Sequence, residues 1–300
     1  MLIDKFTTYL RKERHYSPKT AEAYGADIRA FAEFLKTIYE KDLPQASVKD
    51  IRRWVVYLSS RNLDPRSVNR KLTALRSFYK FLMKTGDVDS NPAAGVPGLK
   101  VRRRKRIPLS ETEIERLLDE TEFKDSFSGW RDKAVLHTFY DTGMRRAELM
   151  GLRLDSFDWA NNLIRIRGKG NKERLVPLLP DLKETLGHYL RWREKTFPNS
   201  ADDAPFFLTD KGKPLYEMFV HRLIHKYVSM VSNKEKRSPH ILRHSFAAHM
   251  LNRGADLNTI KELLGHAGLA ATQHYLHSGL QELKRVYKAA HPHARKKRIP

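Results

Sequence analysis

The sequence contains no cysteine among its 300 residues. This absence excludes disulfide bonds, thiolate zinc ligands and a cysteine nucleophile. A chain without disulfides suits a reducing compartment, and we expect the protein to remain in the cytoplasm, where it is made. Long apolar runs are also absent: no stretch approaches the ~18 residues that a membrane-spanning helix needs. Charges interrupt the apolar positions of Met1 to Pro18, unlike those of a signal peptide.

Acidic residues are scarce relative to basic ones. The chain has 35 Asp and Glu against 57 Lys and Arg, which gives a formal net charge of +22. Such an excess predicts a polyanionic partner, which could be DNA, RNA or an anionic membrane surface. We favour a nucleic acid over a membrane because no segment has the length and hydrophobicity of a membrane span.

Apolar residues make up 40% of the chain, enough for two packed domains. In the first hundred residues they recur at helical spacing, as in Tyr24, Ile28, Phe31 and Leu35. We therefore predict an N-terminal helical domain over residues 1–88. Residues 89–106 are rich in Pro, Gly and basic side chains and predict an interdomain linker. Residues 107–300 would form the second domain.

The second domain is predicted to be mostly helical, with a small antiparallel β-sheet. Ser110 and Glu113 have the spacing of a capping box, which begins a helix. Residues 163–167 and 173–178 flank a glycine-rich turn and predict a β-hairpin. Residues 154–159 are a candidate third strand. The expected fold class is therefore mainly α, in two domains.

Basic residues gather on one face of the helix that Asp64-Pro65 begins and in the linker. The usual interpretation of such a face is a solvated surface, and the linker run would also fit a nuclear-localisation signal. Because few acids interleave with these residues, we predict instead that they contact DNA phosphates. The predicted DNA-binding residues are Arg66, Arg70, Lys71, Arg76, Arg102, Arg103 and Arg104, with Lys80 and Lys84 on the same helix face.

Four short segments of the second domain carry candidate catalytic side chains. They are YDTGMRRAEL with Arg145, GKGNKERLVPL with Lys169, HILRHSFAAHML with His240 and Arg243, and LLGHAGLAATQHY with His266 and Tyr275. Each has an ordinary structural explanation: a surface arginine, a hairpin tip, a helix brace, or one buried tyrosine among twelve. Single features therefore decide nothing, and only their order and combination indicate a function.

The order Arg, Lys, His-x-x-Arg, Gly-His, Tyr resembles the tyrosine recombinase family, also called the lambda-integrase family. The sequences of the four segments resemble those of the bacterial Xer recombinases, and the tail VYKAAHPHA is most like the XerC branch. The resemblance covers nearly the whole chain, including an N-terminal SAM-like, core-binding domain. The tail reads HPHA where relatives commonly read HPRA, a departure that concerns tail contacts rather than chemistry.

The resemblance implies a role for each matching residue. Arg145, and not Arg146, would be the first catalytic arginine, Lys169 the catalytic lysine, and His240 and Arg243 the His-x-x-Arg pair. His266 would match the Gly-His histidine and Tyr275 the nucleophile. The reaction would cleave and rejoin DNA strands through a 3′-phosphotyrosyl intermediate and a Holliday junction.

The physical chemistry agrees with these roles. Two fixed guanidinium groups suit the charge that develops on a phosphoryl transition state, and His266 could donate a further hydrogen bond. A tyrosine with an ordinary pKa of about 10 needs a base, for which His240 is the candidate, and Lys169 could protonate the leaving 5′ oxygen. Two-metal nucleases hold their ions with clustered carboxylates, whereas we expect the acids of this chain to be scattered, with none inside the four segments. We therefore expect no metal and no cofactor in the reaction.

The resemblance also implies partners. We expect a double-stranded DNA recombination site, a homotetramer or a heterotetramer with a sister recombinase, an activating DNA translocase in some systems, and no membrane. The apolar residues Leu283, Val286 and Tyr287 would form the face of an exchange helix that docks into a neighbour, or they would pack within their own domain. The implied role is resolution of chromosome or plasmid dimers before cell division.

Three other interpretations fit part of the sequence. A DNA-binding regulator accounts for the charge and the helices, but not for the ordered catalytic side chains. A type IB topoisomerase shares the chemistry, but it acts as a monomer and needs no exchange helix. A phage or transposon integrase would share the family, and the target DNA sequence does not follow from the chain.

Substitution of Tyr275 by phenylalanine separates the regulator from the recombinase. We expect the variant to bind DNA as the wild type does and to form no covalent complex, because the phenol oxygen is the attacking atom. Binding is measured by mobility shift and the adduct by denaturing electrophoresis. A variant that still forms the adduct would exclude Tyr275 as the nucleophile.

Overall fold

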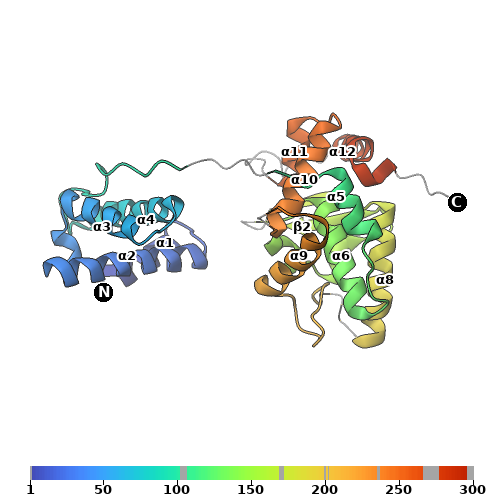
Figure 1. Cartoon of the computed structure of the whole chain (residues 1–300), viewed down its shortest axis with the longest axis horizontal. Helices are drawn as coiled ribbons and strands as arrows, with labels where there is room; N and C mark the ends of the chain where they lie inside the picture. Colours follow the sequence, from blue (N-terminus) through green and yellow to red (C-terminus); the bar gives the residue numbers. More distant parts are fainter. Residues whose placement is uncertain are drawn as a thin grey trace. The chain divides into compact units, whose positions relative to one another are not determined.

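The computed structural model describes residues 2–101, 107–168, 172–198, 201, 203–234, 237–265 and 277–295, although the side chains of residues 277–280, 282 and 295 are left out. The chain forms two compact units, Met1–Lys105 and Arg106–Pro300 (Figure 1). Each unit has its own hydrophobic core. Within the described residues, no helix is long and apolar enough to cross a membrane.

The N-terminal unit is helical, as the spacing of its apolar residues predicts. Its elements are α1 (Leu2–Lys12), α2 (Pro18–Tyr39), the short 3-10 turn η1 (Leu43–Gln45), α3 (Val48–Ser60) and α4 (Pro65–Thr85). The Ser17 side chain accepts a hydrogen bond from the Thr20 backbone at the start of α2, and Asp64 accepts one from Arg66 at the start of α4. Such caps satisfy backbone donors that lack a partner within the helix.

The first part of the predicted linker belongs to the N-terminal unit. Ala93 and Val96 are buried in its core. Arg76, on α4, donates hydrogen bonds to the carbonyl oxygens of Ala93 at 3.2 Å and Val96 at 2.5 Å. The Asn69 side chain makes two hydrogen bonds to the backbone of Leu99. Part of the segment that we predicted as a linker therefore contacts the N-terminal unit, and composition does not reveal these contacts.

Other basic residues of α4 also have partners inside the unit. Arg70 and Lys71 both contact Asp27, whose side chain is buried on α2; Lys71 Nζ lies 2.8 Å from its Oδ1. Arg66 and Lys80 are exposed. The predicted phosphate-binding face thus contains residues that stabilise the unit as well as residues directed to solvent, and Arg102, Arg103 and Arg104 lie outside the described residues.

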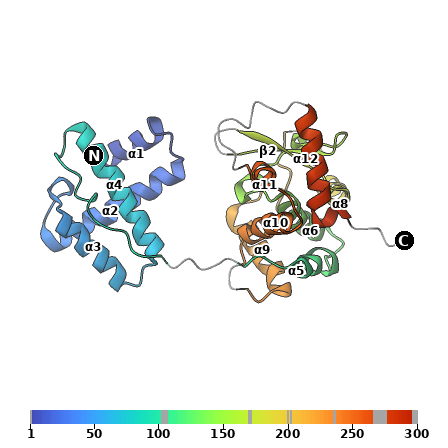
Figure 2. The ribbon, with the colours of Figure 1, turned by 90° about the horizontal axis from the view of Figure 1, so that it is seen from above.

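The second unit is built around the buried helix α6 (Phe127–Thr142), which packs against α8 (Pro180–Thr196) and α10 (Pro239–Asn252). Figure 2 shows this unit from a second direction. The helical elements around them are α5 (Glu111–Glu115), the π-turn η2 (Arg116–Glu120), α7 (Arg146–Met150), η3 (Leu154–Ser156), α9 (Glu217–Val231), α11 (Leu257–Leu264), α12 (His277–Ala290) and η4 (Pro292–Arg295). The capping box of Ser110 and Glu113 is confirmed.

The predicted β-sheet is present. Strands β1 (Phe157–Asp158), β2 (Leu163–Arg167) and β3 (Glu173–Pro177) form an antiparallel sheet in the order β1-β2-β3. Ile164 of β2 pairs with Val176 of β3, and both are fully buried. The third strand exists but is only two residues long.

The C-terminal helix α12 packs against its own unit in this single chain. Leu283 and Tyr287 are buried, and the Tyr287 hydroxyl donates a hydrogen bond to the carbonyl oxygen of Asp141 at the end of α6. Of the two alternatives for this apolar face, the structure of the isolated chain therefore has the one in which it packs within its own domain.

Arg76 and Arg66 provide a matched test of structural and phosphate-binding roles. Arg76→Ala should lower the free energy of unfolding of the N-terminal unit by about 2 kcal/mol, because two carbonyl groups lose their donor. Arg66→Ala should leave stability within about 0.5 kcal/mol and reduce the salt dependence of DNA binding by about one phosphate contact. Urea unfolding and binding titrations at several salt concentrations measure both. Equal effects of the two substitutions on stability would contradict a structural role for Arg76 and a phosphate-binding role for Arg66.

Candidate active site

The first arginine motif forms a tight turn between two helices. Gly143 ends α6 with a φ of 59°, and Arg145 occupies the N-cap position of α7. A β-carbon on Gly143 would lie 2.5 Å from Phe246 and 2.8 Å from Leu264. Glycine is therefore required here both by the left-handed backbone and by the close packing of the turn.

A buried carboxylate holds the arginine of this turn. Glu148 accepts a hydrogen bond from Arg145 Nη1 at 2.8 Å and another from the Arg145 backbone at 2.7 Å. Arg174, on β3, donates to the same carboxylate at 2.7 Å. Burial acts to raise the pKa of Glu148, but the hydrogen bonds and charges of Arg174 and Arg145 outweigh it, so that the pKa lies below its ordinary value. The carboxylate is therefore ionised at neutral pH.

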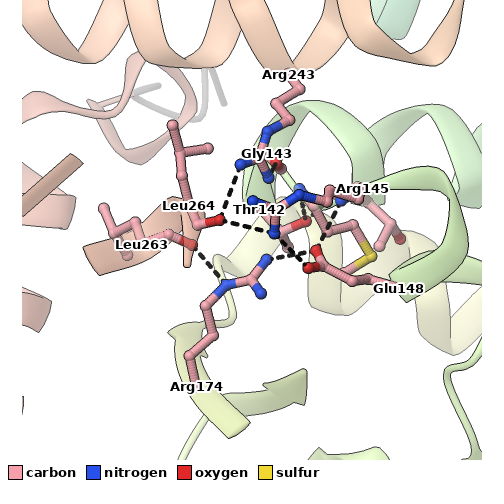
Figure 3. A network of polar contacts seen from close by, with 10 residues as sticks. Thr142, Gly143, Arg145, Glu148, Arg174, Arg243, Leu263 and Leu264 are labelled. Atoms are coloured by element: carbon pink, nitrogen blue, oxygen red, sulfur yellow. Dashed lines mark hydrogen bonds and ion pairs between the residues drawn. The ribbon is translucent and has the colours of Figure 1, made fainter. Parts of the chain in front are cut away.

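The second arginine reaches the same place from α10. Arg243 donates to the carbonyl oxygen of Gly143 at 2.6 Å and to that of Leu264 at 2.8 Å. Arg145 Nη1 lies 3.4 Å from this same Leu264 oxygen, so the two guanidinium groups meet at one carbonyl (Figure 3). Burial and the nearby charge of Arg145 lower the pKa of Arg243 to about 10, which still leaves it protonated at neutral pH.

The end of α11 completes the cluster. Arg174 Nε donates to the carbonyl oxygen of Leu263 at 2.7 Å, beside the Leu264 carbonyl that the other two arginines contact (Figure 3). Gly265 then ends the helix with a φ of 68°, and a β-carbon there would lie 3.0 Å from Arg174. The motif Leu-Leu-Gly is thus fixed against the arginine cluster.

The structure brings two of the six predicted catalytic residues together, Arg145 and Arg243. His240 is exposed on α10, three residues before Arg243. Lys169, His266 and Tyr275 lie outside the described residues. A side-chain carbon at Gly168, next to Lys169 in the sequence, would lie 3.5 Å from Glu148 Oε1. The described end of the hairpin therefore reaches the cluster.

Arg146, for which the motif implies no catalytic role, contacts a different acid. Its Nη2 lies 2.9 Å from Glu217 on α9. The two neighbouring arginines thus have separate partners, and only Arg145 contacts Glu148 and the Leu264 carbonyl among the contacts described. The assignment of Arg145, and not Arg146, as the first catalytic arginine stays a prediction.

Two residues of the cluster were missed from the sequence. Glu148 lies within the first motif, so our expectation that no acid sits inside the four segments was wrong, and this acid pairs with Arg145 and Arg174. Its position three residues after Arg145 could have indicated the backbone hydrogen bond. Arg174 gave a weaker signal, a charged residue on a hairpin strand whose partners lie on distant segments.

Comparison with known proteins gives one consistent family. Residues 108–282 match the Phage integrase family, and residues 3–86 match the phage integrase N-terminal SAM-like domain. The tyrosine recombinase XerC of Chlorobaculum parvum is 36% identical over 319 residues, which cover 97% of this chain and 94% of the relative. XerC of Thermodesulfovibrio yellowstonii is 38% identical over 293 residues, which cover 97% of this chain and 96% of the relative.

Solved structures show the same fold. The XerH site-specific recombinase bound to a palindromic difH substrate, in a post-cleavage complex, matches with a TM-score of 0.72 and 22% identity over 94% of this chain and 83% of that one. The Tn1549 transposon integrase in complex with circular intermediate DNA matches with a TM-score of 0.70 and 16% identity. The match covers 94% of this chain and 98% of that one.

The chain belongs to the phage integrase family. It is a tyrosine recombinase of the Xer type, a site-specific enzyme that breaks and rejoins DNA, and it is similar to XerC recombinases over nearly its whole length.

Glu148 is a positioning residue for Arg145, and its removal tests this role. Glu148→Gln should reduce the rate of strand cleavage by about 10²-fold, because Arg145 loses its anchor. The affinity for DNA should stay within about twofold, since most binding comes from phosphate contacts elsewhere.

The matched control is Glu217→Gln, which removes the partner of Arg146 and should cleave at the wild-type rate. Melting temperatures of both variants verify folding, and single-turnover cleavage on saturating DNA separates the chemical step from binding. Equal loss of cleavage in both variants would mean that Glu148 has no specific role.

Proposed function

We propose that Arg145 and Arg243 form the phosphate site at which Tyr275 cleaves one DNA strand. The observation that supports this proposal is the meeting of their guanidinium groups at the Leu264 carbonyl oxygen. Two cations held side by side repel each other, and the nearby charge of Arg145 contributes to the lowered pKa of Arg243. A phosphodiester placed there relieves this repulsion, and the relief is greatest in the transition state, where its non-bridging oxygens carry the most charge.

The cluster is fixed before substrate binds. Glu148 and the carbonyl groups of Gly143 and Leu264 hold the two arginines through hydrogen bonds of 2.6–3.4 Å. Arg174 in turn holds Glu148 and the end of α11. Preorganised donors need no rearrangement during the reaction, and they account for a large part of the rate in such sites. The forked geometry of arginine also suits two oxygens of one phosphate.

The remaining groups would move protons. His240 would accept the phenol proton of Tyr275, and Lys169 would donate a proton to the leaving 5′ oxygen. His266 would donate a hydrogen bond to the phosphate. The product is a 3′-phosphotyrosyl bond, which conserves the energy of the broken linkage for attack by the 5′ hydroxyl of a second strand. No metal ion or cofactor takes part in these steps.

The wider function follows from the same chemistry. We infer that four protomers, identical or shared with a sister recombinase, assemble on two copies of a recombination site and pass through a Holliday junction. The basic residues of the N-terminal unit would hold the DNA backbone. Resolution of chromosome or plasmid dimers in the cytoplasm, under the control of a DNA translocase in some systems, is the role that similarity to XerC recombinases supports.

A nicked suicide substrate tests the chemistry directly. A break close to the cleavage point releases a short fragment after cleavage, so the covalent complex cannot reverse. We expect the wild type to form a protein–DNA adduct in the presence of EDTA, and peptide mapping to place the DNA on Tyr275. The experiment uses the full-length chain and a duplex with the candidate recombination site.

Tyr216→Phe is the matched control, because Tyr216 is exposed in the same unit but outside the arginine cluster. It should form the adduct as the wild type does, whereas Arg145→Ala and Arg243→Ala should each reduce adduct formation by about 10²-fold. The proposal would be overturned by an adduct on another residue. It would also be overturned if Arg145→Ala and Arg243→Ala both formed the adduct at the wild-type rate.

A further inference from the structure

A second cluster of polar side chains is buried near the C-terminal end of α6, the helix that precedes the arginine turn. His137 and Asp141 are one helical turn apart on α6, and His293 reaches them from η4, after the C-terminal helix. One nitrogen or oxygen atom from each lies within 4.8 Å of the other two. The three residues are 3%, 0% and 6% exposed, so water has little access to the cluster. The reaction proposed above uses none of them.

Two atoms of the cluster lack hydrogen-bond partners within the part of the chain that is described. They are Nδ1 of His137 and Oδ2 of Asp141. Buried polar atoms of this kind are rare in folded proteins, because they lose their contacts with water and gain nothing in exchange. Both atoms are potential metal ligands.

The surroundings of the His137 ring favour the tautomer that can bind a metal through Nδ1. His137 Nε2 lies 3.4 Å from the carbonyl oxygen of Leu118. Because that oxygen can only accept, the proton belongs on Nε2 and the lone pair on Nδ1, which is buried. Ligating histidines commonly donate their other N–H group to a backbone carbonyl in this way.

A further histidine, His291, supports the carboxylate. Its Nδ1 accepts a hydrogen bond from the His293 backbone at 3.2 Å, which leaves the proton on Nε2. This nitrogen lies 3.8 Å from Asp141 Oδ1. The carboxylate is thus surrounded by imidazole groups.

We propose that His137, Asp141 and His293 bind one Zn²⁺ ion through His137 Nδ1, Asp141 Oδ2 and His293 Nδ1. Two imidazoles and a carboxylate are a ligand set that zinc accepts, and the absence of cysteine removes the thiolate alternative. The ion would neutralise the buried carboxylate and join the C-terminal segment to the end of α6, directly before Thr142 and Gly143. Its role would be structural, independent of the recombination chemistry.

The competing explanation is an ion pair without metal. His293 Nδ1 lies 2.9 Å from Asp141 Oδ1, so a protonated His293 could neutralise the carboxylate alone. In that arrangement, however, Nδ1 of His137 gains no partner. Zinc satisfies His137 and Asp141 together, which is why we favour it.

The test measures metal in the full-length chain, carrying a purification tag without histidine. After growth with zinc and passage over a chelating resin, elemental analysis should find about one zinc ion per chain. His293→Arg should bind none, because arginine can still pair with Asp141 but cannot ligate a metal. His137→Gln should also lose the ion. If His137→Gln fails to fold, the charge-conserving His293→Arg variant still decides the question.

Surface binding is controlled with a second histidine pair. His221 and His225 are exposed one turn apart on α9, with ring centroids 6.4 Å apart. The double variant His221→Gln/His225→Gln should keep its zinc. The proposal would be overturned if the wild type contained no more zinc than His293→Arg. It would also be overturned if only the surface double variant lost its zinc.

Two readouts other than metal content complete the test. Cobalt bound in place of zinc should give visible absorption bands in the wild type and none in His293→Arg. Zinc at a concentration well above its dissociation constant should raise the melting temperature of the metal-free wild type by about 5 °C. The same addition should leave the melting temperature of His293→Arg unchanged. Adduct formation in EDTA is measured separately, so either proposal can fail without the other.

Discussion

One buried carboxylate organises the catalytic unit. Glu148 lies between Arg145 and Arg174 and accepts hydrogen bonds of 2.7–2.8 Å from both side chains. Removal of one partner from such a buried pair leaves an uncompensated charge and costs about 3–5 kcal/mol in typical proteins. The geometry of α7, β3 and the arginine turn therefore depends on a single side chain that does not itself act on DNA.

The end of α11 provides the other half of this arrangement. Carbonyl groups at the C-terminal end of a helix carry partial negative charge and lack intrahelical donors. In this protein the carbonyls of Leu263 and Leu264 accept hydrogen bonds from Arg174, Arg243 and Arg145. The arginines thus satisfy the helix end, and the helix end fixes the arginines. Residues 266–275, which include two of the predicted catalytic side chains, follow directly in the sequence.

The sequence predicted the helices and the hairpin, because these depend on local periodicity and short motifs. The shared site of Arg145 and Arg243 was implied by the family resemblance rather than by any local pattern. The sequence did not predict the packing of Ala93 and Val96 or the role of Arg174. Arg174 and Leu263 are 89 positions apart, and a contact of that kind has no periodic signature. The buried set of His137, Asp141 and His293 was missed for the same reason, since it unites a helix turn with the far end of the chain. Lys169, His266 and Tyr275 remain predictions from the motifs.

The pairing of Arg145 and Arg243 at one carbonyl has a consequence for how this fold tolerates change. Like charges in contact disfavour the compact state, and a cation at the N-terminus of α7 also opposes the direction of the helix dipole. This repulsion is offset by the hydrogen bonds that each arginine makes. Loss of Arg145 would take one partner from the buried Glu148 carboxylate, and loss of Arg243 would leave the carbonyl oxygens of Gly143 and Leu264 without this donor. Neither cation can therefore be replaced without a structural cost, even when no DNA is bound.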